Sequence, residues 1–367
     1  MPESKPPGLS PGALFVGIVM ILLFVGVIAL IVLSFFDAMP QIPWPSWFVQ
    51  SETTVEKFGL MFFAVGLFVA VMAVLLLMVD SRKRVPNWTV AIAFVGPAIA
   101  ALLLGLVWPG ISTFIQGLYG RSPWYDQERS EFVGLDNYVN IFTTTEFQIV
   151  LRNTLVWVIL VPLVAVALGL IYATLVDRTR GEALSKGLIF LPMAISLVGA
   201  SIIWKFVYEF RQEGAPQIGL ANQILVWLGL DPYQFLITSP WNTIFLIVVM
   251  IWIQTGFAMT VLSAAITAIP DDIIEAARLD GVTGWGMFRY VTVPSIRPAL
   301  LVVWVTITMT TLKVFDIVRT MTGGQFQTSV VANEFYTQSF RQFNFGLGAA
   351  LAVLLFILVI PVVVYQV

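Results

Sequence analysis

"IVLRNTLVWVILVPLVAVALGLIYATLV", residues 149–176, is almost wholly apolar, and Arg152 is its only charged residue. A helix rises about 1.5 Å per residue, so about 20 apolar residues cross a hydrocarbon core that is about 30 Å thick. Backbone polar groups in lipid must satisfy one another, which favours a helix. The stretch therefore predicts a transmembrane helix.

The rest of the chain repeats this pattern. Hydrophobic residues make up 59% of the sequence and charged residues 11%, which indicates a polytopic membrane protein. Eight apolar segments are long enough to span: 13–36, 58–79, 88–114, 149–176, 188–207, 241–265, 299–318 and 345–367. The expected fold is an all-α integral membrane protein with about eight transmembrane helices.

The charges in the loops predict the orientation of these helices. Basic residues follow the second, fourth and sixth segments: Arg82, Lys83, Arg84, Arg178, Arg180, Lys186, Arg278, Arg289 and Arg297. The alternate loops are rich in acids: Asp126, Glu128, Glu131, Glu209 and Glu213. Because basic loops stay on the cytoplasmic side, both termini are expected in the cytoplasm.

Several chemical functions lack the residues they need. The chain has no cysteine and no histidine, which removes thiolate nucleophiles, imidazole bases and the usual zinc ligands. The net charge of -2 gives no basic surface for nucleic acid, and no G-x-x-x-x-G-K-[ST] phosphate loop occurs. We expect no catalytic residues, no metal site, no cofactor bound by this chain and no enzymatic activity of its own.

The apolar pattern stops between the sixth and seventh segments, where residues 269–298 read "IPDDIIEAARLDGVTGWGMFRYVTVPSIRP". Asp272 as N-cap would place Glu275 at the third helical position, as in a capping box. The spacing predicts a short helix over 273–280. Gly281 suits the left-handed residue that ends a helix.

A second short helix is expected after the first. Thr283 is its expected N-cap, the helix runs to Tyr290, and Pro294 and Pro298 close the loop before the next span. Together the two helices form a hairpin on the cytoplasmic side. Helix physics alone leaves open that this is an ordinary amphipathic surface hairpin.

The residue pattern of this hairpin is more specific than its helix signals. Its pattern consists of Glu275, Ala276, Ala277, Gly281, Val291, Val293 and Pro294. The pattern resembles the EAA motif of permease subunits of binding-protein-dependent ATP-binding-cassette importers, which usually has isoleucine and leucine where Val291 and Val293 stand. The resemblance implies a coupling helix that docks on an ATPase subunit through Glu275, Ala276, Ala277, Gly281 and Pro294.

Other stretches carry the resemblance further. They are "FVGLDNYVNIF" (132–142), "LRNTLVWV" (151–158), "LKVFDIVRTMTGG" (312–324) and "FNFGLGAALAVLLF" (343–356). These are similar to sugar-importer permeases of the maltose type, particularly those for α-glucosides. The resemblance implies a six-helix permease core over 88–367, with the hairpin at 269–298. It is preceded by an N-terminal region, 1–87, that holds two extra transmembrane helices and a basic cytoplasmic linker.

The resemblance also implies a mechanism and a set of partners. Such a permease moves an oligosaccharide, here maltose, trehalose or another α-glucoside, into the cytoplasm by alternating access. It implies a place in the inner membrane of a prokaryote, in contact with lipid. The implied partners are two ATPase subunits that hold ATP and Mg, a second, non-identical permease subunit and an extracytoplasmic sugar-binding protein.

The seventh segment carries one group of candidate substrate-path residues. Thr306, Thr310 and Lys313 are spaced by four and three residues, so they share one helical face, and Asp316 follows three residues later. Charged residues inside a membrane normally face the bundle interior. The alternative is that Lys313 and Asp316 pair only with each other and that the threonines bond between helices.

The sixth segment carries a second group. Gln254 interrupts an apolar run close to Phe257, and a sugar presents hydroxyls and apolar ring faces that suit an amide and an aromatic ring. Helix packing is the alternative explanation for both residues. Maltose-type permeases hold their ligand on this segment and the next, so the resemblance implies a substrate path there.

A different transport class uses the same kind of helices. An ion-coupled secondary transporter could use Lys313 and Asp316 to relay protons or bind the coupling ion. No inverted repeat is visible in the sequence, and a membrane-embedded enzyme lacks its catalytic groups. The hairpin separates these classes, because only an ATPase-coupled permease requires it.

Overall fold

The computed structural model describes residues 95–96, 98–99, 102–121, 131–176, 181–212 and 214–366. The expected spans 13–36 and 58–79 and the linker after them lie outside these residues, as does the expected boundary at 87/88. The chain divides into two compact units, 1–108 and 109–367. The first is described only near its end, where η1 is a π-helix over Leu103–Val107, and helix α5, Trp108–Gln116, follows.

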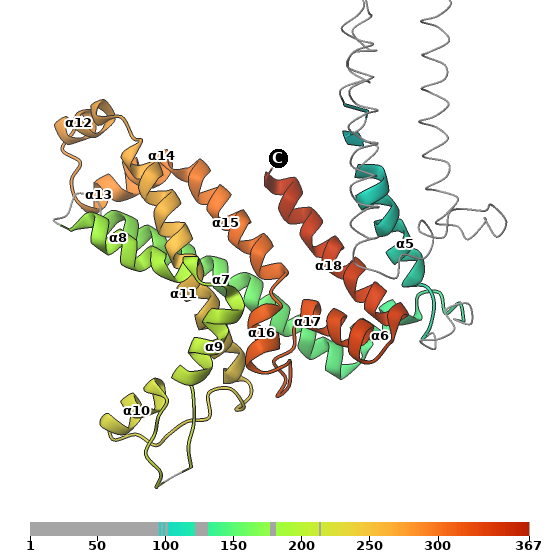
Figure 1. Ribbon diagram of the computed structural model, residues 1–367. Helices are drawn as coiled ribbons and strands as arrows, with labels where there is room; N and C mark the ends of the chain where they lie inside the picture. Colours follow the sequence, from blue (N-terminus) through green and yellow to red (C-terminus); the bar gives the residue numbers. More distant parts are fainter. Residues whose placement is uncertain are drawn as a thin grey trace, which may run out of the picture. The chain divides into compact units, whose positions relative to one another are not determined.

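Three helices of the second unit are long and apolar enough to cross a membrane: α7 (Thr145–Val176), α11 (Trp241–Thr267) and α18 (Phe345–Gln366) (Figure 1). They coincide with expected segments 149–176, 241–265 and 345–367. Each is apolar around its whole circumference, as expected of helices surrounded by protein and lipid. The short helix α6, Asp136–Thr143, precedes α7.

The expected span 188–207 is bent. Helix α8 (Glu182–Phe190) and the 3₁₀ turn η3 (Leu191–Ala194) meet α9 (Leu197–Val207) at 101°. Segment 188–207 is therefore not one straight helix. Pro192 lacks a backbone donor, and Ser196 caps the new helix by accepting a hydrogen bond from the Gly199 amide at 3.0 Å, so α9 begins in a new direction.

The seventh segment differs from its expected extent of 299–318. Helix α15, Arg297–Leu312, ends there with Lys313 as its C-cap, and α16, Asp316–Met321, is a separate helix. The Val314 amide closes a tight last turn by donating to the Thr311 carbonyl at 3.0 Å. Asp316, three residues after Lys313, therefore belongs to a separate helix. A carboxylate is favoured where Asp316 now stands, in the first turn of a helix.

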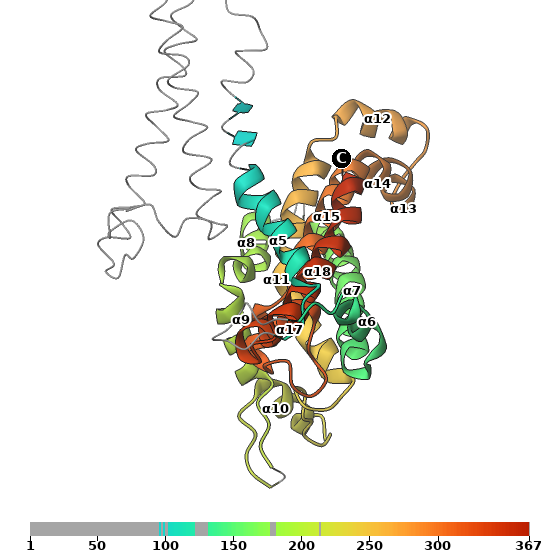
Figure 2. The same cartoon turned by 90° about the vertical axis from the view of Figure 1, so that its right-hand side faces the viewer.

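Short helices lie at the two ends of the bundle. One end carries α12 (Asp271–Leu279), α13 (Trp285–Met287), the π-helix η4 (Phe288–Thr292) and α14 (Val293–Ser295). The others are α10 (Leu220–Trp227), α17 (Val331–Tyr336) and the π-helix η5 (Thr337–Arg341). Figures 1 and 2 show α12 and α10 at opposite ends. We call these the hairpin end and the α10 end.

The core is centred on the contact between α7 and α11, the most extensive of any helix pair described. Small residues recur every fourth position on α7, at Ala165, Gly169 and Ala173. A Cβ atom added at Gly169 would lie 2.5 Å from the Ala258 Cβ and 2.8 Å from the Met259 amide nitrogen. Small residues on one helical face let two backbones approach closely in a membrane, which explains this contact.

Candidate functional site

The hairpin, residues 269–298, projects from the body of the protein. Helix α12 has no buried residue, and Leu279 near its end is 89% exposed. Glu275 and Ala276 are also exposed and Ala277 is half-buried, so the EAA residues lie at a surface. Among the residues that the structure describes, Glu275 makes no ion pair. The carboxylate therefore lies at an exposed surface of the hairpin.

The start of α12 differs from the expected capping box. Its N-cap is Pro270, no side chain caps it, and Asp271 and Asp272 both lie in the first turn. Asp272 is therefore not the N-cap. The proline has an extended backbone, φ -58° and ψ 136°, and the helix starts two residues earlier than expected. The first-turn acids and Arg278 in the last turn still complement the helix dipole.

The end of α12 is as the sequence predicts. Gly281 has a left-handed φ of +83°. Its amide donates to the Arg278 carbonyl at 3.0 Å, and the Val282 amide donates to the Ala277 carbonyl at 2.9 Å. These two bonds form a Schellman motif, which stops the helix sharply. No atom lies within 4 Å of a Cβ added at Gly281, so space does not require glycine there. The left-handed backbone conformation does.

The second limb of the hairpin is longer than expected. Residues 285–295 form a continuous helical stretch, α13, η4 and α14, and Gly284 rather than Thr283 is the N-cap. Gly284 has a φ of +53°, which a β-branched threonine would adopt at a cost. Pro294 lies in the first turn of α14, where its missing amide costs nothing. The stretch then meets α15 at 69°.

Exposed aromatic residues line this second limb. Trp285 and Tyr290 are each 70% exposed, and the Trp285 ring stacks on Phe288 with centroids 5.0 Å apart. The η4 helix also contacts α12, so the two limbs support each other. The hairpin therefore combines a rigid backbone with an exposed surface that is both apolar and charged.

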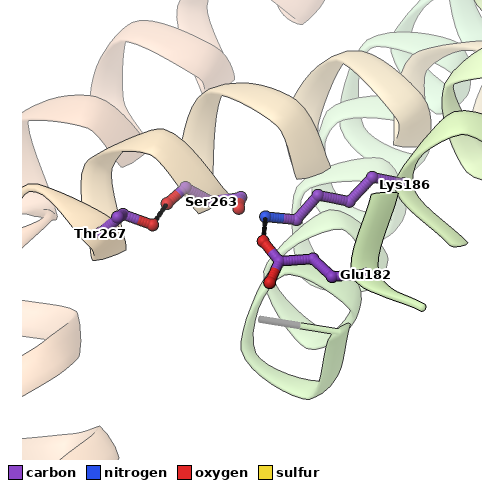
Figure 3. Close-up of polar contacts among 4 residues, drawn as sticks. All are labelled: Glu182, Lys186, Ser263 and Thr267. Carbon is purple, nitrogen blue, oxygen red and sulfur yellow. Dashed lines mark hydrogen bonds and ion pairs between the residues drawn. The ribbon is translucent and has the colours of Figure 1, made fainter. Parts of the chain in front are cut away.

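Helix α8 lies beside the end of α11 that leads into the hairpin (Figure 3). Lys186 pairs with Glu182 on α8 at 2.6 Å, and its side chain points toward Ser263 of α11. Thr267, the last residue of α11, donates to the Ser263 carbonyl at 2.9 Å. Helix α12 of the hairpin begins four residues later, at Asp271. A Cβ at Gly256 would lie 2.6 Å from the Ile189 carbonyl oxygen, so α8 and α11 are in backbone contact. Helix α11, which leads into the hairpin, therefore packs directly on α8.

The candidate substrate-path residues lie on α11 and α15. Gln254 and Phe257 are half-buried on α11, and Gln254 has no hydrogen-bond partner in the described part of the chain. On α15, Thr306 is half-buried and Thr310 exposed, and their hydroxyls donate to carbonyls one turn back, at 2.8 and 2.9 Å. Both helices pack against α7.

Lys313 and Asp316 do not form the ion pair with each other that the sequence left open. Lys313 is exposed at the end of α15, Asp316 is half-buried at the start of α16, and no ion pair joins them. The explanation that these two charges exist only to neutralise each other is therefore not supported by the geometry. Thr306, Thr310 and Lys313 still share the open side of α15.

Two asparagines near the start of α7 and of α11 hold the backbone at Phe326 and Gln327, which the sequence did not predict. We call this arrangement the clamp. Phe326 and Gln327 are consecutive non-glycine residues with left-handed φ angles of +56° and +61°. Asn242 donates to the Phe326 carbonyl at 2.8 Å, and Asn153 to the Gln327 carbonyl at 2.6 Å. The two asparagines are buried. Single amides within apolar segments were the available sequence signal, but their partners lie far away in the chain.

A second polar group adjoins this clamp. Glu334 is 6% exposed and accepts hydrogen bonds from Ser329 at 3.0 Å and from Gln338 at 2.8 Å. Asn153 also donates to the Ser329 carbonyl at 3.0 Å. Buried polar groups are costly unless bonded in this way, so the network fixes the segment between α16 and α18.

Comparison with known proteins decides the family. Residues 147–367 match the family described as "binding-protein-dependent transport system inner membrane component". The chain belongs to this family. The matched range includes the hairpin, α7, α11, α15 and α18. It is a permease subunit, and the membership does not support the ion-coupled alternative.

Two relatives have related assignments. The permease is 47% identical over 271 residues to the osmoprotective compounds uptake permease protein of Synechocystis, covering 74% of this chain and 95% of the relative. It is 45% identical over 291 residues to the alpha-glucoside transport system permease protein of Rhizobium meliloti, covering 79% and 85%. The expected resemblance to sugar-importer permeases is confirmed.

A solved structure shares the fold. A chain of the bacterial alginate ABC transporter, in complex with an alginate pentasaccharide-bound periplasmic protein, superposes with a TM-score of 0.63 at 23% identity. The match covers 76% of the permease and 93% of that chain. The all-helical permease fold expected from the sequence is therefore confirmed.

Proposed function

We propose that this permease carries an α-glucoside, such as maltose or trehalose, into the cytoplasm by alternating access. The 45% identity to an alpha-glucoside transport system permease protein carries the proposal. The free amide of Gln254 beside Phe257 and the threonines on the open side of α15 support it, because a sugar needs hydrogen-bonding groups and an aromatic surface.

The hairpin faces the cytoplasm in this proposal. Arg278, Arg289 and Arg297 lie on it, and basic loops remain cytoplasmic. Both termini are then cytoplasmic, and the α10 end faces outward. Two ATPase subunits bind ATP and Mg²⁺, and one of them receives α12 through Glu275, Ala276, Ala277, Gly281 and Pro294. Nucleotide-driven closure moves α8 and α11 through the base of the hairpin by rigid-body rocking.

Two further partners complete the importer. A second, non-identical permease subunit closes the substrate path, because the open side of α15 leaves Thr310 and Lys313 exposed. An extracytoplasmic sugar-binding protein delivers the sugar to the α10 end. Binding-protein dependence is the defining property of the family to which the chain belongs.

Reconstitution tests the proposal directly. The permease and its partner subunits are placed in proteoliposomes with external binding protein, and uptake of labelled maltose and trehalose is measured with and without internal ATP. We expect uptake that requires ATP and is competed by unlabelled α-glucosides but not by the β-linked cellobiose. ATP-independent uptake that collapses with an ionophore would contradict ATP coupling. ATP-driven uptake of a non-sugar osmoprotectant alone would favour the assignment of the Synechocystis relative.

Gln254→Ala and Thr310→Ala test the path residues. Each removes one hydrogen-bonding group, which is worth about 0.5–1.5 kcal/mol, so we expect uptake at saturating binding protein to fall by roughly 3- to 10-fold. Thr308→Ala on α15 is the control, because Thr308 is buried and lies about 160° around the helix from Thr306 and Thr310. Unchanged uptake in both variants would contradict the proposal that Gln254 and Thr310 line the substrate path.

A further inference from the structure

Helix α10, Leu220–Trp227, buries a polar side chain and exposes several apolar ones. Asn222 is completely buried; its side-chain amide donates to the Glu209 carbonyl at 2.9 Å and its oxygen accepts from the Tyr233 amide at 2.7 Å. Leu225 packs inward against the core, but Leu220 and Ile224 are exposed, and Trp227 is 73% exposed. A helix at a water surface normally presents a polar side to the solvent. The exposed side of α10 is instead apolar.

Contacts within the loop hold helix α10 in this orientation. Gln217 bonds to both backbone groups of Arg211, accepting from the amide at 2.9 Å and donating to the carbonyl at 2.7 Å. A Cβ at Gly219 would lie 2.2 Å from the Glu209 carbonyl oxygen, so the backbone at Gly219 is in close contact with the backbone at Glu209. The apolar side cannot turn inward without breaking these contacts and exposing Asn222.

Aromatic rings fasten the following part of the loop to α11. Phe235 meets Phe245 of α11 edge-on with centroids 4.7 Å apart, and it stacks on Tyr208 at 5.1 Å. The Tyr208 hydroxyl donates to the Phe245 carbonyl at 3.2 Å. Residues 208–212 and 214–240 therefore form an extension of α9 and α11 that is held to these two helices by ring contacts.

The exposed surface of this extension is large and nearly uncharged. Its principal residues are Ile218, Leu220, Ile224, Trp227, Leu228 and Leu230, each between 43% and 73% exposed. Between residues 214 and 240, Asp231 is the only charged residue. Contiguous apolar surfaces of this kind mark contacts with protein or membrane. We call these six residues the α10 surface.

We propose that the α10 surface lies in the outer membrane–water interface of the bilayer, with its apolar side chains among the lipid. Amphipathic helices lie in the interface plane with the apolar side buried about 5–10 Å. Tryptophan is enriched at that depth, and Trp241 at the first turn of α11 is exposed as well. The inference rests on the proposed orientation only for the choice of leaflet.

Two observations favour lipid over a protein partner. Helix α10 packs against α9, whose exposed residues Ile202, Ile203 and Phe206 are also apolar, so the α10 surface continues the apolar side of a spanning helix. A soluble binding protein that docks and leaves in each cycle meets an interface with a polar rim, whereas the α10 surface has no charge. Figure 1 shows α10 at the end of the bundle opposite α12, next to α9.

Spin labelling tests the proposal in the assembled importer. The chain has no cysteine, so single variants Ile224→Cys, Trp227→Cys and Leu228→Cys can each carry one nitroxide label. The importer is reconstituted in vesicles, and collision rates of the label with oxygen and with a water-soluble nickel chelate are measured. Gln212→Cys is the control, because Gln212 is an exposed polar residue of the same loop.

We expect oxygen to collide several-fold more often than nickel at all three sites, and nickel to dominate at Gln212→Cys. Nickel access at the three sites would show a surface in water and overturn the proposal. Exclusion of both reagents would show a protein partner or the N-terminal region covering α10, and would overturn it too. Three sites keep the test decisive if one variant fails to assemble. The readout does not require transport, so it stays separate from failure of the proposed function.

Discussion

Glu275→Arg is expected to abolish most ATP-driven uptake. The carboxylate is exposed on α12 without an ion pair in the described part of the structure, so it is available to a basic residue of the ATPase subunit. Losing a buried charge pair at an interface costs about 2–5 kcal/mol, which corresponds to a roughly 30- to 4,000-fold weaker complex. Charge reversal falls at the upper end, because it buries two like charges together. Pull-down with the ATPase subunits and uptake in proteoliposomes measure both effects.

Asp280→Arg is the matched control for this prediction. It makes the same charge change in the same hairpin, and Asp280 lies roughly 140° around the helix from Glu275. An arginine at the C-cap is favourable for the helix dipole, so α12 should remain folded. Near-normal binding by Asp280→Arg together with lost binding by Glu275→Arg would locate the contact. Equal binding by both variants would refute docking through Glu275 and direct attention to Trp285 and Tyr290.

Gly169→Leu is expected to disrupt the contact between α7 and α11. Even the Cβ of an alanine would lie 2.5 Å from the Ala258 Cβ and 2.8 Å from a backbone nitrogen, and neither atom belongs to a flexible side chain. Overpacking by a methyl group costs about 1–3 kcal/mol, and leucine adds more volume at the same point. Gly169→Ala should therefore lower the unfolding temperature in detergent. Gly169→Leu should prevent accumulation of folded permease.

Gly187→Ala provides the comparison. Gly187 is on α8, and no atom lies within 4 Å of its added Cβ. Alanine is favoured over glycine inside a helix by roughly 0.5–1 kcal/mol, so this variant should unfold at the same or a higher temperature. A similar loss of stability in Gly169→Ala and Gly187→Ala would mean that the close approach of α7 and α11 does not limit stability.

Local patterns in the sequence predicted several features that the structure retains. Long apolar runs identified α7, α11 and α18, because a spanning helix satisfies its own backbone and needs only apolar side chains outside. The end of α12 at Gly281 followed from a left-handed conformation that glycine adopts without strain. The EAA pattern, Glu275 to Pro294, indicated an importer permease before any fold was known.

The start of α12 shows where local rules compete. Asp272 with Glu275 fits a capping box, yet Pro270 begins the helix and both acids enter its first turn. The break after Leu312 is similar, because apolar and threonine residues continue past it and no helix breaker marks the site. Sequence periodicity reports which residues suit a helix, and it does not report where packing requires the chain to change direction.

Apolar length and glycine conformation act over a few neighbouring residues, so the sequence predicts a helical membrane protein with a hairpin that ends its first helix at Gly281 and carries a permease motif. The clamp on Phe326 and Gln327 and the burial of Asn222 in α10 are visible only in the folded chain. The clamp depends on contacts between distant parts of the chain, such as Asn153 with Gln327. The free energy of a buried hydrogen bond depends on the partner that folding brings to it, and that partner is not visible in the local sequence.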